Sequence, residues 1–288
     1  VIVAYDGFFT SHQKRKVQYF SDRTAVQAFV GECPTEFPHV DVNNPITIGA
    51  HMNGDDLTNN HYQQSNAMYR AGEIFKEVAK EYGELSGRHY DTLDLYQMED
   101  AEVALFLLNS AAETAKDIVD SLRQQGIKAG VISPNIIRPF PKEEIKAALK
   151  NVKVLLVGER ADSYGANGPN LTHEVKSALQ EDKDNETLVL SRVFGLGGKD
   201  FYPEDAQAFF DETLHVLQTG EIEKAFDYYG VHKGQEENKL EPIITPQTGD
   251  VYKTGLIQVT PDEETGKLKV RIPPIRALME KPKRLAPG

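Results

Sequence analysis

Cysteine is almost absent from this sequence, and its scarcity excludes several kinds of site. The 288 residues include a single cysteine, Cys33. The chain therefore cannot form an internal disulfide, and alone it cannot hold an iron–sulfur cluster or a zinc ion bound by cysteines. Structural disulfides are typical of oxidising compartments, so we expect this chain in a reducing cytoplasm.

Positive charge and long apolar runs are also scarce. Lys and Arg number 32 against 44 Asp and Glu, which gives a net charge of −12. This excess of acidic residues argues against nucleic acid or an anionic membrane as the main partner, whereas a basic partner chain or plain solubility fits it equally well. No apolar run approaches the roughly 18 residues that a membrane-spanning helix needs. The composition is that of a soluble globular protein, with length for one large domain or two ordinary ones.

An initiator methionine and a signal peptide are missing from the start of the sequence. The chain begins with Val1-Ile2-Val3, already inside an apolar run. We therefore expect it to be the C-terminal part of a longer polypeptide, whose upstream residues are not seen here.

The first 90 residues combine short apolar runs with one long irregular stretch. Residues 33–60 are rich in proline, asparagine and glycine, and a loop of this length is usually functional or interfacial. The segment "ELSGRHYDT" (84–92) then marks a domain boundary. The expected elements are strands at 1–7 and 16–20, a helix from Ser21 or Asp22 to about Val30, and an amphipathic helix from Asn60 to about Leu85.

Strands and helices alternate regularly from about residue 100 to 200. Continuous apolar runs indicate parallel strands that are covered on both faces. Helices and short links separate them, an order typical of right-handed β-α-β units in an α/β domain. The expected strands are 102–109, 127–133, 152–159 and 187–195, and the expected helices are one that ends near Gly126, one at 142–150 and one at 170–179.

The sequence "IIRPFPKEEI" (136–145) joins a strand to a helix through two prolines. Pro139 restricts Arg138 to an extended conformation, and Pro141 suits the first position of a helix, where its missing N–H costs nothing. Glu143 and Glu144 suit the positive end of that helix. We interpret the segment as a rigid structural hinge rather than a site of direct chemistry.

Two segments near predicted strand ends could bind a ligand, but each has a plainer interpretation. "ERADSYGANGPNLTHEV" (159–175) resembles a phosphate-binding turn, although it lacks the G-x-G-x-x-G fingerprint and the Walker lysine. Glu159 and Arg160 could pair with each other or across an interface. "DGFFTSH" places Asp6, Ser11 and His12 just past a strand end, where open α/β sheets bind ligands. A histidine held in a loop hydrogen-bond network explains that segment better, since the G-x-S-x-G elbow of hydrolases is missing.

Several strings, taken together and in order, resemble one family. They are "DGFFTSH", "NNPITIGA", "HYQQSNAM", the long run from Met98 to Ile145, "GERADSYGANGP" and "FGLGGKD". This series resembles the α subunit of 2-oxoacid:ferredoxin oxidoreductases, of which pyruvate:ferredoxin oxidoreductase is the best known. The resemblance implies an α/β fold with three parts. Residues 1–90 would end a thiamine-enzyme pyrimidine-binding domain, residues 91–220 would form a transketolase C-terminal-type domain, and residues 221–288 would be a C-terminal extension that wraps another subunit.

The resemblance also implies a multi-subunit enzyme that oxidatively decarboxylates a 2-oxoacid with thiamine diphosphate and magnesium. Electrons would pass to [4Fe–4S] clusters on partner subunits and then to ferredoxin, and coenzyme A could accept the acyl group. No residue of this chain is assigned a catalytic, cofactor-binding or metal-binding role. The activating glutamate would lie upstream of Val1, and the G-D-G…N-N signature for the diphosphate and magnesium is missing.

Two segments depart from the family pattern. Residues 51–60, "HMNGDDLTNN", replace an expected aromatic and charged stretch, so His51, Asn53, Asp55 and Asp56 could shape substrate or partner choice. Relatives that act on oxalate or aryl-glyoxylates therefore stay open beside pyruvate enzymes. The tail includes "GLIQVTPDEETGKLKVRIPP" (255–274), which predicts a β-hairpin with its turn at Thr265-Gly266. Two other classes also stay open: a non-catalytic interaction module with a transketolase-like fold, and a phosphate or nucleotide binder that uses residues 159–170.

Overall fold

The computed structural model describes residues 2–7, 10–14, 16–32, 41–46, 49, 51–231, 258–261 and 268–271. The chain divides into two compact units, Val1–Gly230 and Val231–Gly288. Within the described residues, no helix is both long enough and apolar enough to cross a membrane.

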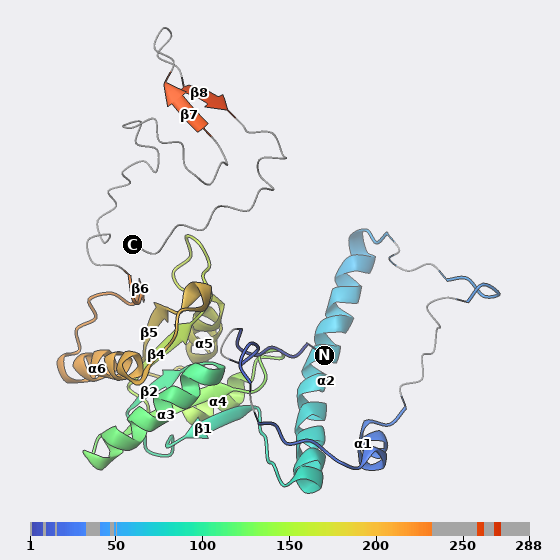
Figure 1. Ribbon diagram of the computed structural model, residues 1–288, viewed down its shortest axis with the longest axis horizontal. Coiled ribbons are helices and arrows are strands. Elements are labelled where there is room, and N and C mark those ends of the chain that lie inside the picture. Colours follow the sequence, from blue (N-terminus) through green and yellow to red (C-terminus); the bar gives the residue numbers. More distant parts are fainter. Residues whose placement is uncertain are drawn as a thin grey trace. The chain divides into compact units, whose positions relative to one another are not determined.

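The first unit is built on a mixed six-stranded sheet (Figure 1). Its strands lie in the order β1-β3-β2-β4-β5-β6; β1 is antiparallel to β3, and every other pair is parallel. The predicted α/β class and the four predicted strands are confirmed. The strands are β1 Leu93–Tyr96, β2 Val103–Phe106, β3 Ala129–Pro134, β4 Val154–Glu159, β5 Leu188–Val193 and β6 Phe226–Tyr228.

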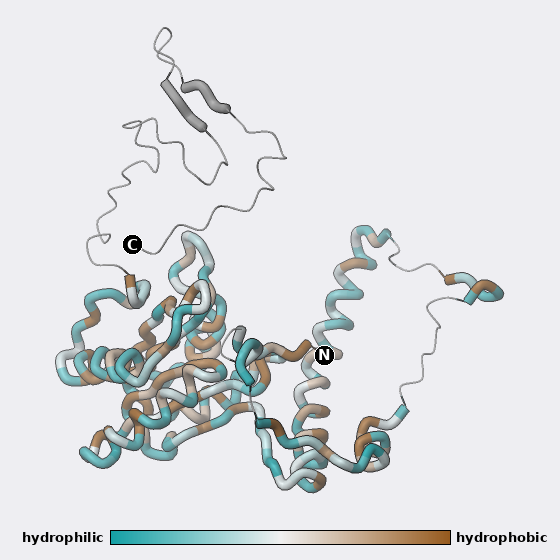
Figure 2. Tube along the Cα trace, in the orientation of Figure 1, coloured by the Kyte–Doolittle hydropathy of each residue, from teal (hydrophilic) through white to brown (hydrophobic). Residues whose placement is uncertain are grey.

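Helices cover both faces of this sheet, which explains why its inner strands are apolar along their whole length. Helices α3 (Asn109–Gln124) and α6 (Pro203–Thr219) pack on one face, against alternate strand residues such as Leu105 and Leu156. Helices α4 (Lys142–Ala148) and α5 (Asn170–Gln180) pack on the other, against residues such as Phe106 and Val157. Figure 2 shows the hydrophobic stretches gathered inside this unit. Two separate cores therefore fix the sheet between its helices.

The sequence patterns did not predict the two edge strands of the sheet or helix α6, which packs on one of its faces. Strand β1 has four residues and β6 three, and neither is fully buried. Helix α6 was also not predicted, although Pro203 stands at its first turn and the Asp205 carboxylate accepts a hydrogen bond from the Tyr202 amide. Short half-exposed strands gain their stability from the neighbouring strand, so their sequences alone carry little signal.

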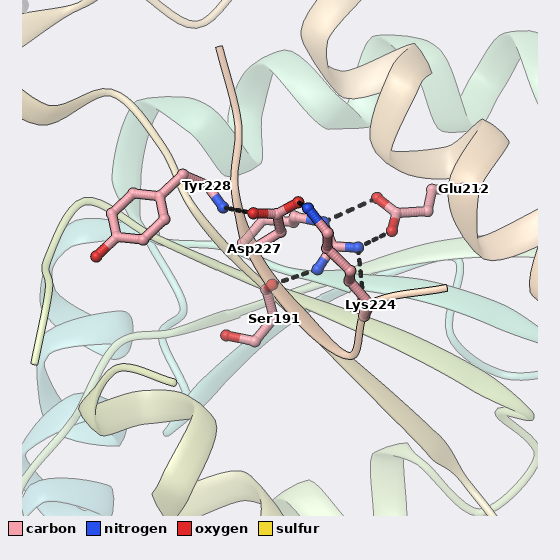
Figure 3. Close-up of polar contacts among 6 residues, drawn as sticks. Ser191, Glu212, Lys224, Asp227 and Tyr228 are labelled. Atoms are coloured by element: carbon pink, nitrogen blue, oxygen red, sulfur yellow. Dashed lines mark hydrogen bonds and ion pairs between the residues drawn. The ribbon is translucent and has the colours of Figure 1, made fainter. Parts of the chain in front are cut away.

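Arg192 on β5 connects α6 and the segment before β6 to the sheet; Figure 3 labels two residues that it contacts, Glu212 and Lys224. Its guanidinium pairs with the Glu212 carboxylate of α6 and donates to the backbone carbonyl of Lys224, at 2.9 Å. Arg192 is 6% exposed, so the pair is largely removed from water. Residues 221–230 were assigned to the C-terminal extension; they are part of the first compact unit, because β6 pairs with β5.

The segment before β1 differs from its prediction in two ways. Residues 2–7 and 16–20 form no strand, so both predicted strands are wrong over their described residues. An apolar run of this length is ambiguous unless another strand pairs with it. Helix α1 (Arg23–Val30) is confirmed, and the Asp22 carboxylate accepts a hydrogen bond from the Thr24 amide as its N-cap.

Helix α2 (Gly54–Ser86) begins six residues earlier than predicted. Asn53 is extended at its N-cap, and Asp55 and Asp56 occupy the first turn, where negative charge is favourable. The predicted loop at 33–60 is therefore shorter; its residues 33–40, 47, 48 and 50 lie outside the described part of the chain. The predicted apolar face of α2 is not buried, and only Ala79 and Gly83 of this helix are.

Two places join α2 to its surroundings. Tyr82 packs against the rings of Phe20, Phe29 and Tyr90, with centroids 6.0–6.2 Å away. At the middle of the helix, a Cβ on Gly72 would stand 3.0 Å from Pro139, and Lys76 pairs with Glu144 at 2.9 Å.

The second unit contains strands β7 (Gln258–Pro261) and β8 (Leu268–Arg271). They pair antiparallel, with Pro261 opposite Leu268. The predicted pairing of these two segments is confirmed, while the predicted turn at Thr265-Gly266 lies outside the described residues.

Candidate functional site

The carboxyl ends of β2 and β4 form the natural ligand position of this sheet. These strands are neighbours, but the chain leaves β2 toward α3 on one face and leaves β4 toward α5 on the other. In open α/β sheets, ligands bind in the crevice outside such a reversal of strand order. A cavity of about 560 Å³ lies there, lined by residues that include Asn109 after β2, Arg160 after β4 and Gly195 after β5.

The N-termini of α3 and α5, which begin beside this cavity, are already occupied by carboxylates of the chain. Asp6 accepts a hydrogen bond from the Ser110 amide of α3 at 2.8 Å. Glu159 accepts from the amides of Leu171 and Thr172 at 2.8 and 3.0 Å, and from the Thr172 hydroxyl at 3.0 Å. These positions are the ones where a phosphate binds in nucleotide-binding folds. Because Glu159 takes that place, these contacts argue against the phosphate-binding interpretation of 159–170.

Arg160 lies beside Glu159, but the two do not pair as the sequence suggested they could. Its Nε is buried and has no hydrogen-bond partner among the described residues. The guanidinium lies over the Phe194 ring, 5.5 Å from the centroid. A Cβ on Gly195 would stand 2.9 Å from the same Nε, so glycine leaves the room that the arginine side chain occupies.

Arg138 of the "RPFP" segment makes contacts that suit a hinge. The Arg138–Pro139 peptide bond is cis. One guanidinium nitrogen donates to the Ile137 carbonyl at 2.8 Å, and another pairs with Glu174 of α5 at 2.6 Å. Pro141 is the N-cap of α4 rather than its first residue. The structural role of Arg138 stays a prediction that these contacts support.

The remaining predicted site residues are not brought together. Ser11 and His12 are exposed and hydrogen bonded to each other, at 2.6 Å between the hydroxyl oxygen and Nδ1. The other predicted residues lie at the exposed start of α2 and do not line the cavity at the carboxyl edge. They are His51, Asn53, Asp55 and Asp56.

Phe194 and Gly195 were missed as site residues by the sequence analysis. The string "FGLGGKD" was noted, but no residue in it was assigned to a site, and the contact of Phe194 with Arg160 depends on the pairing of β4 with β5. A glycine directly after a predicted strand was the one available signal, and here its φ of +63° also favours glycine.

Comparison with known proteins connects this fold to one family. Residues 101–206 match the family "Pyruvate:ferredoxin oxidoreductase core domain II", and this range includes Arg138, Glu159, Arg160 and Gly195. The pyruvate synthase subunit PorA of Thermotoga maritima is 39% identical over 75% of this chain and 54% of its own length. The chain belongs to the α-subunit family of 2-oxoacid:ferredoxin oxidoreductases. The resemblance found in the sequence is thereby confirmed.

Other members of the 2-oxoacid:ferredoxin oxidoreductase family differ in the substrate that their names give. The ketoisovalerate oxidoreductase subunit VorA of Pyrococcus horikoshii is 33% identical over 79% of this chain and 57% of its own length. A solved 2-oxoglutarate:ferredoxin oxidoreductase from Magnetococcus marinus is 18% identical over 47% of this chain and 21% of its own, with a TM-score of 0.33 that is too low to support an argument. The chain spans about half the length of the curated relatives that it matches.

The cofactors that the family implies do not fit the described part of this chain. Thiamine diphosphate needs a diphosphate site with magnesium, but carboxylates occupy the two helix N-termini at the cavity. The described residues contain no group of three or more His, Cys, Asp or Glu side chains that could hold a metal ion. With one cysteine in the whole sequence, a four-cysteine cluster cannot form within the chain.

Proposed function

We propose that this chain is part of the α subunit of a cytoplasmic, thiamine-diphosphate-dependent 2-oxoacid:ferredoxin oxidoreductase. The observation that carries this proposal is the 39% identity with a pyruvate synthase subunit over three quarters of the chain. The complex would oxidatively decarboxylate a 2-oxoacid, with pyruvate as the first candidate, and transfer the electrons to ferredoxin. Coenzyme A would accept the acyl group. Branched 2-oxoacids, oxalate and aryl-glyoxylates are the alternative substrates.

Within that enzyme, residues 1–90 would end the pyrimidine-binding domain and the sheet domain would be of the transketolase C-terminal type. Because the cofactors fit the described residues poorly, we infer that the cofactor sites and the subunit interfaces are contributed by different parts of the complex. Other residues of the complex would hold thiamine diphosphate, magnesium and the [4Fe–4S] clusters. This chain would complete the domain of the thiamine site and would provide subunit interfaces. The arm that contains β7 and β8 would pack on a neighbouring subunit.

The surface of α2 supports an assembly role. Leu57, Met68, Ile74 and Val78 fall on one side of the helix and are each between 41% and 57% exposed. A large exposed apolar surface marks an interaction site in soluble proteins, because leaving it in water is unfavourable. We therefore expect partner subunits to cover this face.

Isolation of the native complex through a tag on this chain tests the proposed function. We expect partner chains to co-purify and to carry the visible absorption of [4Fe–4S] clusters. Ile74→Gln on the exposed apolar face should lower the yield of partners, whereas Glu77→Gln, one turn away on the same helix, should not. A colourless chain that purifies alone would contradict the proposal.

The second candidate is a non-catalytic interaction module with a transketolase-like fold. The observation that favours it is that Asp6 and Glu159 of the chain itself accept from amides at the two helix N-termini beside the cavity. The same purification separates the two, because such a module would bring down partners that have neither clusters nor oxoacid-dependent activity.

A further inference from the structure

Arg160 lines the cavity at the carboxyl edge of the sheet, and its buried Nε has no hydrogen-bond partner among the described residues. We propose that Arg160 and this cavity bind the carboxylate of a small organic acid with an apolar body. The proposed oxidoreductase function does not require this site, and nothing in that function depends on it.

The charges around the cavity leave Arg160 as the group that would receive an anion. The carboxylates of Asp6 and Glu159 are both engaged by backbone amides at helix N-termini. The other arginine on the cavity wall, Arg138, already pairs with Glu174. Among the described residues, the buried Nε of Arg160 has no hydrogen-bond partner.

The Nε atom of Arg160 is buried, so its missing hydrogen bond is not replaced by one to water. The Nε atom is out of contact with water and its hydrogen bond is unmade, which is costly for a charged group. The Phe194 ring lies against one face of the guanidinium, so a ligand would approach the planar edge rather than that face. That edge presents parallel N–H donors, the geometry that binds a carboxylate through two hydrogen bonds.

The wall of the cavity determines what the rest of the ligand would be. Its volume of about 560 Å³ is in the range of small-molecule sites. Leu108, Ile137, Leu171 and Leu196 contribute apolar side chains beside Phe194. Because carboxylates already accept from amides at the two neighbouring helix N-termini, these termini are poorly suited to a multiply charged phosphate. A single carboxylate on an apolar body matches this combination.

A titration with matched probes tests the proposal on the 288-residue chain. Benzoate has the carboxylate and the apolar body, benzamide is its neutral counterpart, and inorganic phosphate has charge without an apolar body. The Nε–H signal of Arg160 in a nitrogen–proton correlation spectrum reports directly on the buried atom, and its loss in Arg160→Lys assigns it. We expect benzoate to shift this signal and the other two probes to leave it in place.

Substitution provides the second measurement. Arg160→Gln should weaken benzoate binding at least about tenfold, since it removes a charge-assisted hydrogen-bonding group. Arg70→Gln, the same change at an exposed position of α2 outside the cavity, should leave the affinity unchanged. If Arg160→Gln does not fold, the wild-type spectrum still decides.

Three outcomes would overturn the proposal. They are equal effects of benzoate and benzamide on the Arg160 signal, an effect of phosphate as strong as that of benzoate, or no effect of benzoate up to its solubility limit. Benzoate has no 2-oxo group and cannot be a substrate of the proposed enzyme. A negative result here therefore leaves the proposed function untouched, and failure of the purification leaves this test intact.

Discussion

Glu159→Gln should destabilise the first unit more than any ordinary surface change, because the carboxylate closes the N-terminus of α5. Glu159 is 4% exposed and accepts three hydrogen bonds from Leu171 and Thr172. A glutamine keeps one oxygen acceptor, but it places an NH₂ group where the second oxygen accepts from Thr172. One buried donor of Thr172 then faces another donor.

The magnitude follows from two losses. Leaving a buried amide without its acceptor costs about 1–3 kcal/mol. Removing a negative charge from a helix N-terminus costs a further ~0.3–1 kcal/mol, and up to about 2 kcal/mol at a partly buried site. We therefore expect the free energy of unfolding to fall by roughly 2–4 kcal/mol.

Urea unfolding of the wild-type chain and of the Glu159→Gln variant measures this difference. Glu113→Gln is the matched control, because Glu113 is 67% exposed and pairs only at the surface with Lys116. Its effect should stay within about 0.5 kcal/mol. If both substitutions change the free energy of unfolding by the same small amount, the role of Glu159 at α5 is refuted.

Three further predictions concern the alkaline limit, the hinge and the start of α2. Burial, and then the hydrogen bond to Asp205, raise the pKa of Tyr229 to about 12 from a usual value of 10.0. The folded chain thus favours the neutral phenol, so its contribution to stability is complete below pH ~10 and is lost as the pH rises toward about 12. Unfolding measured across that window should show a decline that Tyr229→Phe removes, and an unchanged decline in the variant would contradict the shift. Arg138→Ala should lower the free energy of unfolding by up to about 1 kcal/mol, a small effect because its ion pair with Glu174 is exposed. It should also reduce the yield of complex while leaving the turnover per assembled complex nearly intact. A large loss of turnover in fully assembled complex would show that Arg138 has a direct role. Replacing residues 51–60 by a glycine–serine linker removes the N-cap and the first turns of α2 and should alter assembly or oxoacid preference, whereas wild-type kinetics and assembly would exclude such a role.

The sheet domain was predictable because its strands are buried on both faces. A run such as 152–159 is apolar throughout, and the structure places β4 there with every residue buried. The edge strands β1 and β6 were not predictable on the same basis, since they are short and their exposed residues interrupt the pattern. Residues 2–7 gave the opposite error: a strand was predicted there and none is present. An apolar run forms a strand only if another strand pairs with it.

The position of the candidate site at the end of β4 was predictable from the sequence, but the contacts between its side chains were not. The end of β4 was identified from the string that begins at Glu159, and the sequence suggested that Glu159 pairs with Arg160 or across an interface. The true partners of Glu159 are amides of α5, which a turn of intervening residues brings back to the strand end. Likewise, Arg160 meets Phe194 only because β4 and β5 are neighbours in the sheet. Side-chain partners set by tertiary structure leave no local pattern in the sequence.

Oxoacid-dependent dye reduction tests whether this chain works as a subunit of a 2-oxoacid:ferredoxin oxidoreductase. The native complex, isolated through this chain, and the pure chain are each assayed with a viologen dye, thiamine diphosphate, magnesium, coenzyme A and a panel of 2-oxoacids. We expect the complex to reduce the dye with at least one 2-oxoacid, and the chain alone neither to reduce the dye nor to bind thiamine diphosphate tightly. Dye reduction by the pure chain, or a pure complex inactive with every 2-oxoacid tested, would contradict it.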